Sequence, residues 1–520
     1  MNYSKICTFI ICICSLLISN NVSGQEFNFS GNLKKGTYNV GLRIVEQVDN
    51  SRAFYQNDRN KNDKFSGNRN IRIYVWYPAE KSPDNRNMFF EEYVKLMMID
   101  YSLITDEKGK LDMEKVKALN LFRGVNEDNH TTILRSETSS VRNAEPAANK
   151  FPLIVFGQGL YYESPVSHFI ICEYLASHGY VVATCPLYGT DSRFVNYDVR
   201  GIHTQIRDME FVISYCMSLP YVEDKTLGVM GFDLGAQSGL LLAMKNENVD
   251  VLVTIDGGMM IATPADALRQ SSHYNVDNMR VPLMHLTRTE RGLFEAYIRH
   301  EQSLFNTSKF SDIYIVGIDG SQHVNFNSYS MFGLENQVPM YWGPMDVDGR
   351  AAHETVCMYA LNFLDAHLKK SQKAADFIND DPEKHFSGIS IKKEKKSGIE
   401  PPPKETVFLN LIYNGRSSDA VRLYQKVKGK FPGTTILNQA VINRLGYEYM
   451  YKLGAFETAV DIFKLNVLAF PESANAYDSL AESYLNAGKI EQAVKNYKKS
   501  LELNPENTNA QEILKRFNIK

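Results

Sequence analysis

The 520-residue chain lacks a strong charge of either sign, since 57 Lys and Arg nearly balance 60 Asp and Glu. A basic surface is the usual electrostatic footprint of a nucleic-acid-binding protein. The formal net charge of −3 therefore indicates no nucleic-acid partner. The hydrophobic content of 44% is that of a globular protein, and the length suffices for more than one domain.

Long hydrophobic runs are also scarce, and the one at the N-terminus is short for a membrane span. It covers residues 6–18, follows the positive charge of Lys5, and precedes small residues at 22–24. This order of charged, apolar and small residues is typical of a secretory signal peptide. We therefore expect residues 1–24 to be cleaved before Gln25 and the chain to be exported, to the periplasm or the medium. An uncleaved membrane anchor is the alternative.

Cysteines are few, and three of the seven lie in this leader. The other four are Cys172, Cys185, Cys216 and Cys357. Their spacing matches no metal-binding motif, so we expect no metal and no other cofactor. Buried free thiols are the expected state. A Cys172–Cys185 disulfide is the alternative for an exported protein, and the sequence leaves it open.

Short apolar runs alternate with helical patterns from residue 151 onward. The expected strands are 152–156, 180–186, the run that begins at Thr226, 249–255, 281–286 and 313–318, and the expected helices are 168–178, 203–219 and 353–369. Strands that alternate with helices predict a mostly parallel sheet covered on both faces, within a domain of residues 25–370. Residues 36–45 and 71–77 alternate apolar and polar positions and predict two further strands.

Two segments lack this regularity. Residues 86–148 are polar and helical in character, with candidate helices at 90–104 and 113–122, so we expect a helical insertion that caps the site. Residues 371–404 are rich in Lys and end in three prolines, Pro401–Pro403, which predicts a linker.

Residues 405–520 contain an internal repeat. Gly488 follows Gly454 by 34 residues, Pro505 follows Pro471 by the same interval, and a degenerate third copy precedes them. The period resembles the tetratricopeptide repeat, which is built from helix pairs. About three copies reach the minimum for a stable stack. We expect the repeats to bind a protein or peptide partner, with packing on the chain's own first domain as the alternative.

Serine is missing from the place where a strand–turn–helix pattern calls for a nucleophile. Residues 226–239 consist of an apolar run, a turn with glycines two residues on either side of Asp233, and a helix-forming segment. This is the pattern of a nucleophile elbow. Side chains at Gly231 and Gly235 would collide with the neighbouring strand and helix. The residue at the centre is Asp233, where most such elbows carry Ser.

An acid and a histidine follow the elbow in the order of α/β-hydrolase triads. Asp256 comes directly after one predicted strand, and His323 lies on a loop after the last one. The carboxyl ends of parallel strands share one edge of the sheet, so we expect these groups to meet Asp233 there. A carboxylate at Asp256 can hold the imidazole in the required tautomer. Glu290 is the second choice for this acid.

The oxyanion hole is expected to consist of two backbone N–H groups, those of Leu160 and Leu234. Gly157 and Gly159 let the loop that carries Leu160 approach a ligand closely. Three tyrosines are expected to line the pocket, with a place in the core as the alternative: Tyr161, Tyr162 and Tyr188.

Residues 36–369 resemble the platelet-activating-factor acetylhydrolase branch of the α/β-hydrolase superfamily. The resemblance is carried by Gly159-Leu160 and by residues 175–183, 208–212, 228–235, 255–257 and 320–323. It implies hydrolysis of short or oxidised acyl esters, including lipid esters, by Ser, Asp and His without a metal. It also implies that Asp256 is the acid, His323 the base, and Leu160 and Leu234 the oxyanion donors. The chain departs from the family at Asp233 and at Gln158, where the family has Ser and His.

Asp233 leaves two hypotheses open. Haloalkane dehalogenases and epoxide hydrolases use a carboxylate nucleophile on this fold: it attacks an alkyl carbon, and a His-activated water hydrolyses the resulting ester. Attack on an acyl carbon would give a mixed anhydride, and a carboxylate beside the oxyanion hole repels the developing charge. The first hypothesis is thus an exported hydrolase with Asp233 as nucleophile or as part of a modified site, acting on a small-molecule or lipid ester-like substrate.

The second hypothesis is a degenerate hydrolase fold that binds partners through its repeats. Asp is a favourable helix N-cap, because the free N–H groups and the helix dipole stabilise a carboxylate. Asp233 would then have only this capping role. Ser238 lies five residues on, within the predicted helix, and is a poor substitute nucleophile.

Overall fold

The computed structural model describes most of the chain, in two compact units that divide between Ile399 and Glu400. The described residues are 27–57, 64–81, 86–103, 107, 110–118, 122, 125–161, 163–191, 193–257, 267–332, 347–433 and 435–517. The predicted signal peptide, residues 1–24, lies outside these ranges.

The first unit is built on an 11-stranded sheet whose order is β11-β10-β9-β8-β7-β5-β6-β2-β1-β4-β3. The strands are β1 (Asn39–Asn57), β2 (Lys64–Ala79), β3 (Asn87–Phe89), β4 (Glu137–Arg142), β5 (Phe151–Gly157), β6 (Val181–Thr184), β7 (Val222–Phe232), β8 (Val251–Ile255), β9 (Leu283–Arg288), β10 (Ile313–Ile318) and β11 (Ile391–Lys396). The six strands from β10 to β6 are parallel to one another. The predicted fold class, a mostly parallel sheet with flanking helices, is confirmed.

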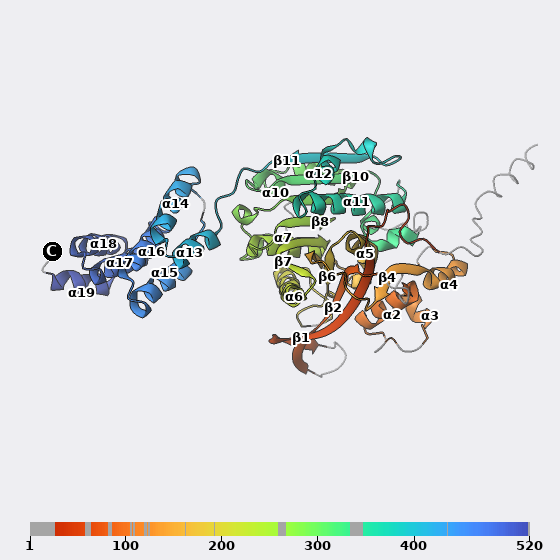
Figure 1. Ribbon diagram of the computed structural model, residues 1–520, viewed down its shortest axis with the longest axis horizontal. Helices are drawn as coiled ribbons and strands as arrows, with labels where there is room; N and C mark the ends of the chain where they lie inside the picture. Colours follow the sequence, from red (N-terminus) through yellow and green to blue (C-terminus); the bar gives the residue numbers. More distant parts are fainter. Residues whose placement is uncertain are drawn as a thin grey trace, which may run out of the picture. The chain divides into compact units, whose positions relative to one another are not determined.

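Helices cover both faces of this sheet (Figure 1). One core lies under α2 (Phe90–Asp100), α3 (Met113–Ala118), α4 (Glu127–Arg135), α5 (Phe169–Ser177), α11 (Gly349–His367) and α12 (Gln372–Asn379). The other core lies under α6 (Val199–Met217), α7 (Leu234–Lys245), α8 (Ala267–Gln270), α9 (Leu293–Arg299) and α10 (Leu304–Thr307). Short 3-10 helices occur at η1 (Pro165–His168), η2 (Val276–Asn278), η3 (Glu290–Gly292), η4 (His323–Phe326), η5 (Ser328–Phe332) and η6 (Pro382–Lys384).

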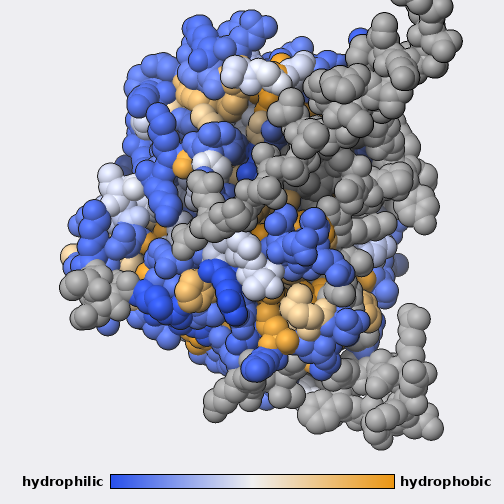
Figure 2. Space-filling model, turned by 90° about the vertical axis from the view of Figure 1, so that its right-hand side faces the viewer, coloured by the Kyte–Doolittle hydropathy of each residue, from blue (hydrophilic) through white to orange (hydrophobic). Residues whose placement is uncertain are grey.

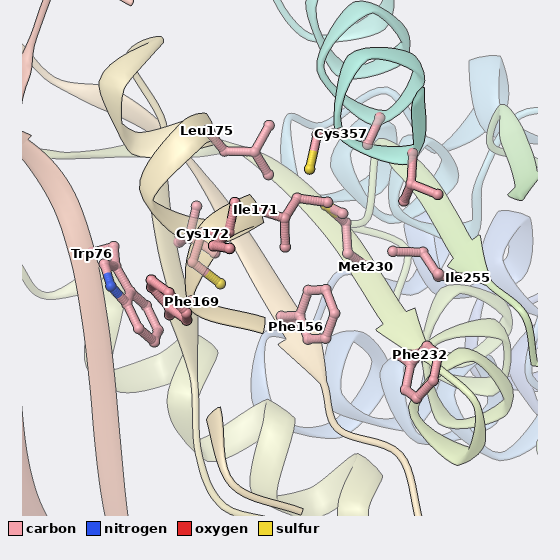
Figure 3. Close-up of a cluster of buried hydrophobic side chains, with 14 of the residues drawn as sticks. Trp76, Phe156, Phe169, Ile171, Cys172, Leu175, Met230, Phe232, Ile255 and Cys357 are labelled. Atoms are coloured by element: carbon pink, nitrogen blue, oxygen red, sulfur yellow. The ribbon is translucent and has the colours of Figure 1, made fainter. Parts of the chain in front are cut away.

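Each central strand contributes to both cores, because successive side chains of a strand point to opposite faces. In β7, Val229 packs into the core under α6 and α7, whereas Met230 and Phe232 pack into the one under α5 and α11. Figure 3 shows Met230 and Phe232 among side chains of β5, α5 and α11. Burial on both faces explains why these strands are continuous apolar runs in the sequence.

The predicted helical insertion, residues 86–148, is only partly helical. It contains α2, α3 and α4, but it also contributes β3 and β4 to the sheet. β4 pairs in parallel with β1 and antiparallel with β3. The segment Glu137–Arg142 is rich in Ser and Thr and lacks the apolar alternation that predicts a strand, so no local pattern indicates it.

The prediction that residues 371–404 form a linker is wrong for most of this segment. It contains α12 and β11, and β11 pairs antiparallel with β10 from Ile391 to Lys396. The lysines that suggested a linker attach this edge strand to two neighbouring helices: Lys392 forms an ion pair with Glu295 of α9, and Lys396 Nζ donates to backbone oxygens in and beside α10. The folded unit therefore extends to Ile399, and α13 begins only six residues later. Charged residues are typical of edge strands, where they prevent pairing with other chains.

Cys172, Cys185, Cys216 and Cys357 are free thiols, so the alternative Cys172–Cys185 disulfide is not formed. Among the described residues, no helix combines the length and the apolar character that crossing a membrane requires. The face of the molecule in Figure 2 is mainly hydrophilic, with hydrophobic residues in small groups.

The second unit is a stack of helix pairs, as the repeat predicts. Its helices are α13 (Glu405–Tyr413), α14 (Ser417–Lys430), α15 (Gln439–Tyr447), α16 (Phe456–Ala469), α17 (Ala474–Asn486), α18 (Ile490–Leu503) and α19 (Thr508–Arg516), with a π-helical turn at Glu448–Lys452. Gly415, Gly454 and Gly488 occupy the same turn in the three pairs, at φ of +72°, +63° and +72°. The repeated glycines therefore supply a left-handed backbone conformation that other residues adopt only with strain.

Three glycines pack backbone against backbone where β5, β7 and α7 meet. A Cβ on Gly231 would lie 2.1 Å from the carbonyl oxygen of Gly235, and one on Gly235 would lie 2.1 Å from that of Gly157. The predicted collisions at both elbow glycines are thus confirmed.

We expect Gly235→Ala to lower the free energy of unfolding by about 3 kcal/mol, because the added methyl group forces two backbones apart. The matched control is Gly239→Ala in the same helix, where the nearest atom to the new Cβ is a Val229 methyl group at 3.1 Å. Its effect should stay within about 1 kcal/mol, since Ala favours the helix. Thermal unfolding of the full chain measures both, and equal losses would contradict the assignment.

Candidate active site

Asp233 occupies the turn between β7 and α7 in a strained backbone conformation. Its φ and ψ are +50° and −115°, and its N–H donates to the carbonyl oxygen of Ile255 on β8 at 3.0 Å. A non-glycine residue in such a region costs about 1–3 kcal/mol, and the surrounding structure must enforce it. The strand and the helix, fixed by the glycine contacts, hold the Asp233 side chain above the edge of the sheet.

The Asp233 carboxylate lies against both predicted oxyanion donors. The Leu160 N–H donates to Asp233 Oδ2 at 2.9 Å, and the adjacent Leu234 N–H acts to lower the pKa of the same carboxyl group. An ordinary N-cap has an extended backbone and accepts from the second or third residue of the helix. Asp233 has neither feature: its φ is +50°, and its side chain makes no such capping hydrogen bond. The carboxylate therefore accepts from the N–H of the loop after β5 instead of capping α7, and it lies where the sequence predicts an oxyanion hole.

His323 and Asp256 form a pair beside Asp233. His323, the first residue of η4, places Nδ1 2.5 Å from Asp256 Oδ2. Its ring stacks on that of Phe232, the residue before Asp233, with centroids 4.5 Å apart and planes at 25°. Asp256 follows β8, the neighbour of β7 in the sheet, with its side chain 1% exposed. The structure thus brings together all five predicted groups: Asp233, Asp256, His323, Leu160 and Leu234.

Two further groups hold Asp256, and the sequence analysis did not identify them. Arg288 Nε lies 2.8 Å from Asp256 Oδ2, an ion pair in which the N–H does not point straight at the carboxylate. Thr287 Oγ1 donates to Asp256 Oδ1 at 3.3 Å. Both residues end β9, so the rule that chemistry gathers at carboxyl strand ends could have found them. Glu290, the second-choice acid, instead accepts a hydrogen bond from Gln322 Nε2.

The pKa values of the two carboxyl groups shift in opposite directions. Burial raises the pKa of Asp233, and the positive charge of His323 and the two N–H groups lower it by less. Burial also acts to raise the pKa of Asp256, but the hydrogen bond and charge of His323, together with Arg288, hold it well below its usual range. Asp256 is therefore ionised at neutral pH.

Backbone strain is concentrated around these groups. In the described part of the chain, the non-glycine residues with positive φ are Ser102, Asn143, Tyr161, Asp233, Asp256 and Lys370. Three of the six belong to the site or adjoin it, since Tyr161 follows Leu160 directly. Strained residues cluster in this way at active sites and ligand clamps.

The remaining predicted residues have other surroundings. Tyr161 is 86% exposed, whereas the Tyr188 hydroxyl donates to the carbonyl oxygen of Asp100 at 3.0 Å. Tyr162 lies outside the described residues. Ser238 is buried and donates its proton to Gln205 Oε1 at 2.6 Å, so it does not replace the missing nucleophile. Within the described ranges, no three His, Cys, Asp or Glu side chains are arranged to hold a metal ion.

Comparison with known proteins gives two family matches. Residues 207–321 match the family described as BAAT / acyl-CoA thioester hydrolase C terminal, and residues 474–507 match the tetratricopeptide repeat. The first unit therefore has a hydrolase-like α/β fold, and the second contains tetratricopeptide repeats. No curated protein matches the chain.

Among solved structures, the chain is similar to a ferulic acid esterase from Streptomyces cinnamoneus. The two share 20% sequence identity with a TM-score of 0.48, over 67% of this chain and 94% of that one. The narrower resemblance to the acetylhydrolase branch stays a prediction.

We expect Asp233→Asn to raise the melting temperature at pH 7. Because the pKa of Asp233 is raised on folding, its ionisation opposes folding above that pKa, and the penalty disappears as the pH falls below the ordinary value of 3.8. The uncharged variant avoids the penalty, so its advantage should vanish at acidic pH. Calorimetry as a function of pH measures the difference.

Asp198→Asn provides the matched control for this experiment. Asp198 is an ordinary N-cap of α6, with extended backbone and a hydrogen bond from the Gly201 N–H at 2.7 Å. Asn and Asp are nearly equivalent at such positions, so the melting temperature should hardly change. A melting temperature for Asp233→Asn below that of Asp198→Asn at pH 7 would contradict the electrostatic account.

Proposed function

We propose that the first unit is a hydrolase in which Asp233 attacks an electrophilic alkyl carbon and His323 activates the water that releases the product. The substrate would be a small molecule or lipid that carries a halide or an epoxide. The observation that carries the proposal is the position of the Asp233 carboxylate, which lies in the oxyanion hole beside the His323–Asp256 pair. The strained backbone of Asp233 supports it, since a capping role would not require that conformation.

In the first step, the Leu160 and Leu234 N–H groups hold one carboxylate oxygen of Asp233. The other oxygen attacks the alkyl carbon and forms an ester, and the halide or epoxide oxygen leaves with the bonding electron pair. The held oxygen becomes the carbonyl oxygen of this ester. This carbonyl oxygen already lies in the oxyanion hole, where negative charge develops in the next step.

In the second step, His323 acts as the base. Asp256 holds Nδ1, so Nε2 takes a proton from water while the hydroxide attacks Cγ of Asp233. The Leu160 and Leu234 N–H groups stabilise the resulting oxyanion, and Asp256 stabilises the imidazolium. Collapse of this intermediate breaks the bond between Cγ and the product oxygen, which takes the proton from His323 Nε2 and leaves as an alcohol. Asp233 is regenerated with one oxygen from water.

Acyl esters and thioesters fit this site less well. They are the substrates of the acetylhydrolase branch that the sequence resembles and of the thioester hydrolase family that matches residues 207–321. Attack of Asp233 on an acyl carbon gives a mixed anhydride, which is higher in energy than an ester. The oxyanion of such a substrate would also compete with the Asp233 carboxylate for the same N–H groups.

We also propose export of the chain and a partner for its repeats. The order of charged, apolar and small residues in 1–24 supports cleavage of a signal peptide and export to the periplasm or the medium. The tetratricopeptide match at residues 474–507 supports a protein or peptide partner for the second unit.

We expect His323→Gln to slow release of product by about 10²–10⁴-fold, because the general base is lost while the nucleophile stays. The alkyl-enzyme ester should then accumulate and appear in intact-mass spectra after incubation with a panel of epoxides and haloalkanes. Asp233→Asn is the control that should form no adduct. Turnover by the wild type in H₂¹⁸O should place ¹⁸O in the Asp233 carboxylate. No adduct and no turnover with any substrate would instead favour a non-catalytic binding protein.

We expect Asp233→Ser to create hydrolysis of p-nitrophenyl acetate at a rate on the order of tenfold or more above the wild type. The hydroxyl group would leave the Leu160 and Leu234 N–H groups to the substrate oxyanion, and His323 would serve as its base. Asp233→Ala and the double variant Asp233→Ser, His323→Gln should show no gain. A gain that survives loss of His323 would show that the imidazole does not serve this site.

A further inference from the structure

A chain of buried hydrogen bonds joins the loop that carries Leu160 to α6 and α7. Gln205 on α6, 4% exposed, donates from Nε2 to the backbone carbonyl oxygen of Gln158 at 2.7 Å. Its Oε1 accepts from Ser238 Oγ on α7 at 2.6 Å. Because the carbonyl of Gln158 can only accept, Gln205 must turn its NH₂ group toward the loop and its oxygen toward Ser238. The Gln158 carbonyl thereby fixes the orientation of the Gln205 amide, and the Ser238 hydroxyl holds the amide oxygen in that orientation.

The side chain of Gln158 is held by a second set of hydrogen bonds, which involves β5 and β6. Its Nε2 donates to Thr184 Oγ1 at 2.9 Å, and Thr184 Oγ1 donates in turn to the carbonyl oxygen of Phe156 at 2.6 Å. All of these side chains are buried, so loss of one partner leaves a polar group unpaired. Gln158 is thus fixed both at its backbone and at its side chain.

The loop needs this support because Gly159 follows. A Cβ on Gly159 would lie 2.7 Å from Phe232 Cδ1 and 2.8 Å from the Cβ of Asp233, so no other residue fits there. Glycine, however, leaves the backbone free to rotate. The hydrogen bond to the Gln158 carbonyl fixes the peptide plane between residues 158 and 159. The Leu160 N–H, which donates to Asp233, belongs to the next peptide plane.

We propose that Gln205 is a positioning residue that keeps the Leu160 N–H directed at the Asp233 carboxylate, with Ser238 as its orienting partner. Gln205 touches neither Asp233 nor Leu160 through any described hydrogen bond, and it acts through the carbonyl of Gln158. The change that we expect in the titration of Asp233 does not depend on the proposed function. The change that we expect in reaction rates rests on the proposed function.

The first test is the titration of Asp233 in the full chain, followed by carbon NMR with labelled aspartate and assigned by its absence in Asp233→Asn. Gln205→Met keeps the length of the side chain and removes its hydrogen bonds. The Asp233 carboxyl group should then titrate at higher pH than in the wild type, since an N–H donor that stabilises the anion is lost. Ser238→Ala should shift the titration in the same direction by less, and it replaces Gln205→Met as the decisive variant if that protein does not fold.

Ser311→Ala is the matched control, because it removes one buried hydrogen bond, that to the Val281 carbonyl, at the other end of the parallel strands. It should lower the melting temperature without changing the Asp233 titration. An unchanged Asp233 titration in folded Gln205→Met, or equal shifts in Gln205→Met and Ser311→Ala, would overturn the proposal.

The second test is kinetic. Gln205→Met should slow hydrolysis of the Asp233 ester by about 10–100-fold, because the oxyanion forms in that step, and should leave alkylation nearly unchanged. The ester would then accumulate in the variant and not in the wild type. Equal slowing of both steps would contradict a role through Leu160. If the wild type turns over no substrate and His323→Gln forms no ester, the proposed function fails, and the titration alone still decides the role of Gln205.

Discussion

The contact between the backbones of Gly157, Gly231 and Gly235 is the constraint on which the site depends. Because none of these residues has a side chain, the end of β5, the end of β7 and the first turn of α7 approach within van der Waals contact. The loop after β5 then passes close enough for the Leu160 N–H to reach Asp233 at 2.9 Å. A larger residue at any of the three positions would move one of these elements outward and open the hole.

This geometry gives the two carboxyl groups of the site different electrostatic environments. Asp256 is surrounded by His323, Arg288 and Thr287, which keep it ionised and attached to the imidazole. Asp233 has mainly backbone N–H groups as partners, and burial raises its pKa. Opposite shifts in neighbouring groups are typical of sites that divide acid, base and nucleophile roles among similar side chains. The Asp233 carboxylate is thus costly to ionise, and that cost is consistent with a group kept for chemistry.

The three strands that local pattern analysis missed, β3, β4 and β11, lie at or next to the edges of the sheet. β4 is rich in Ser and Thr, and β11 has four lysines in six residues, so neither has the apolar alternation of a strand with one buried face. Each is a strand because a neighbour offers unpaired backbone groups, β1 and β3 for β4, and β10 for β11. Such pairing depends on residues far away in the chain, which no local pattern can reveal.

The sequence by itself determined the alternation of strands and helices, the elbow around Asp233, the helix-pair repeats, and the order of Asp256 and His323. These features are local, because apolar periodicity and glycine positions act within a few residues. Only the tertiary structure decided that the Asp233 carboxylate turns toward the Leu160 N–H, that Arg288 and Thr287 hold Asp256, and that Gln205 donates to the loop before Leu160. Each of these depends on the direction of side chains brought together from separate elements, and direction is set by packing across the whole sheet.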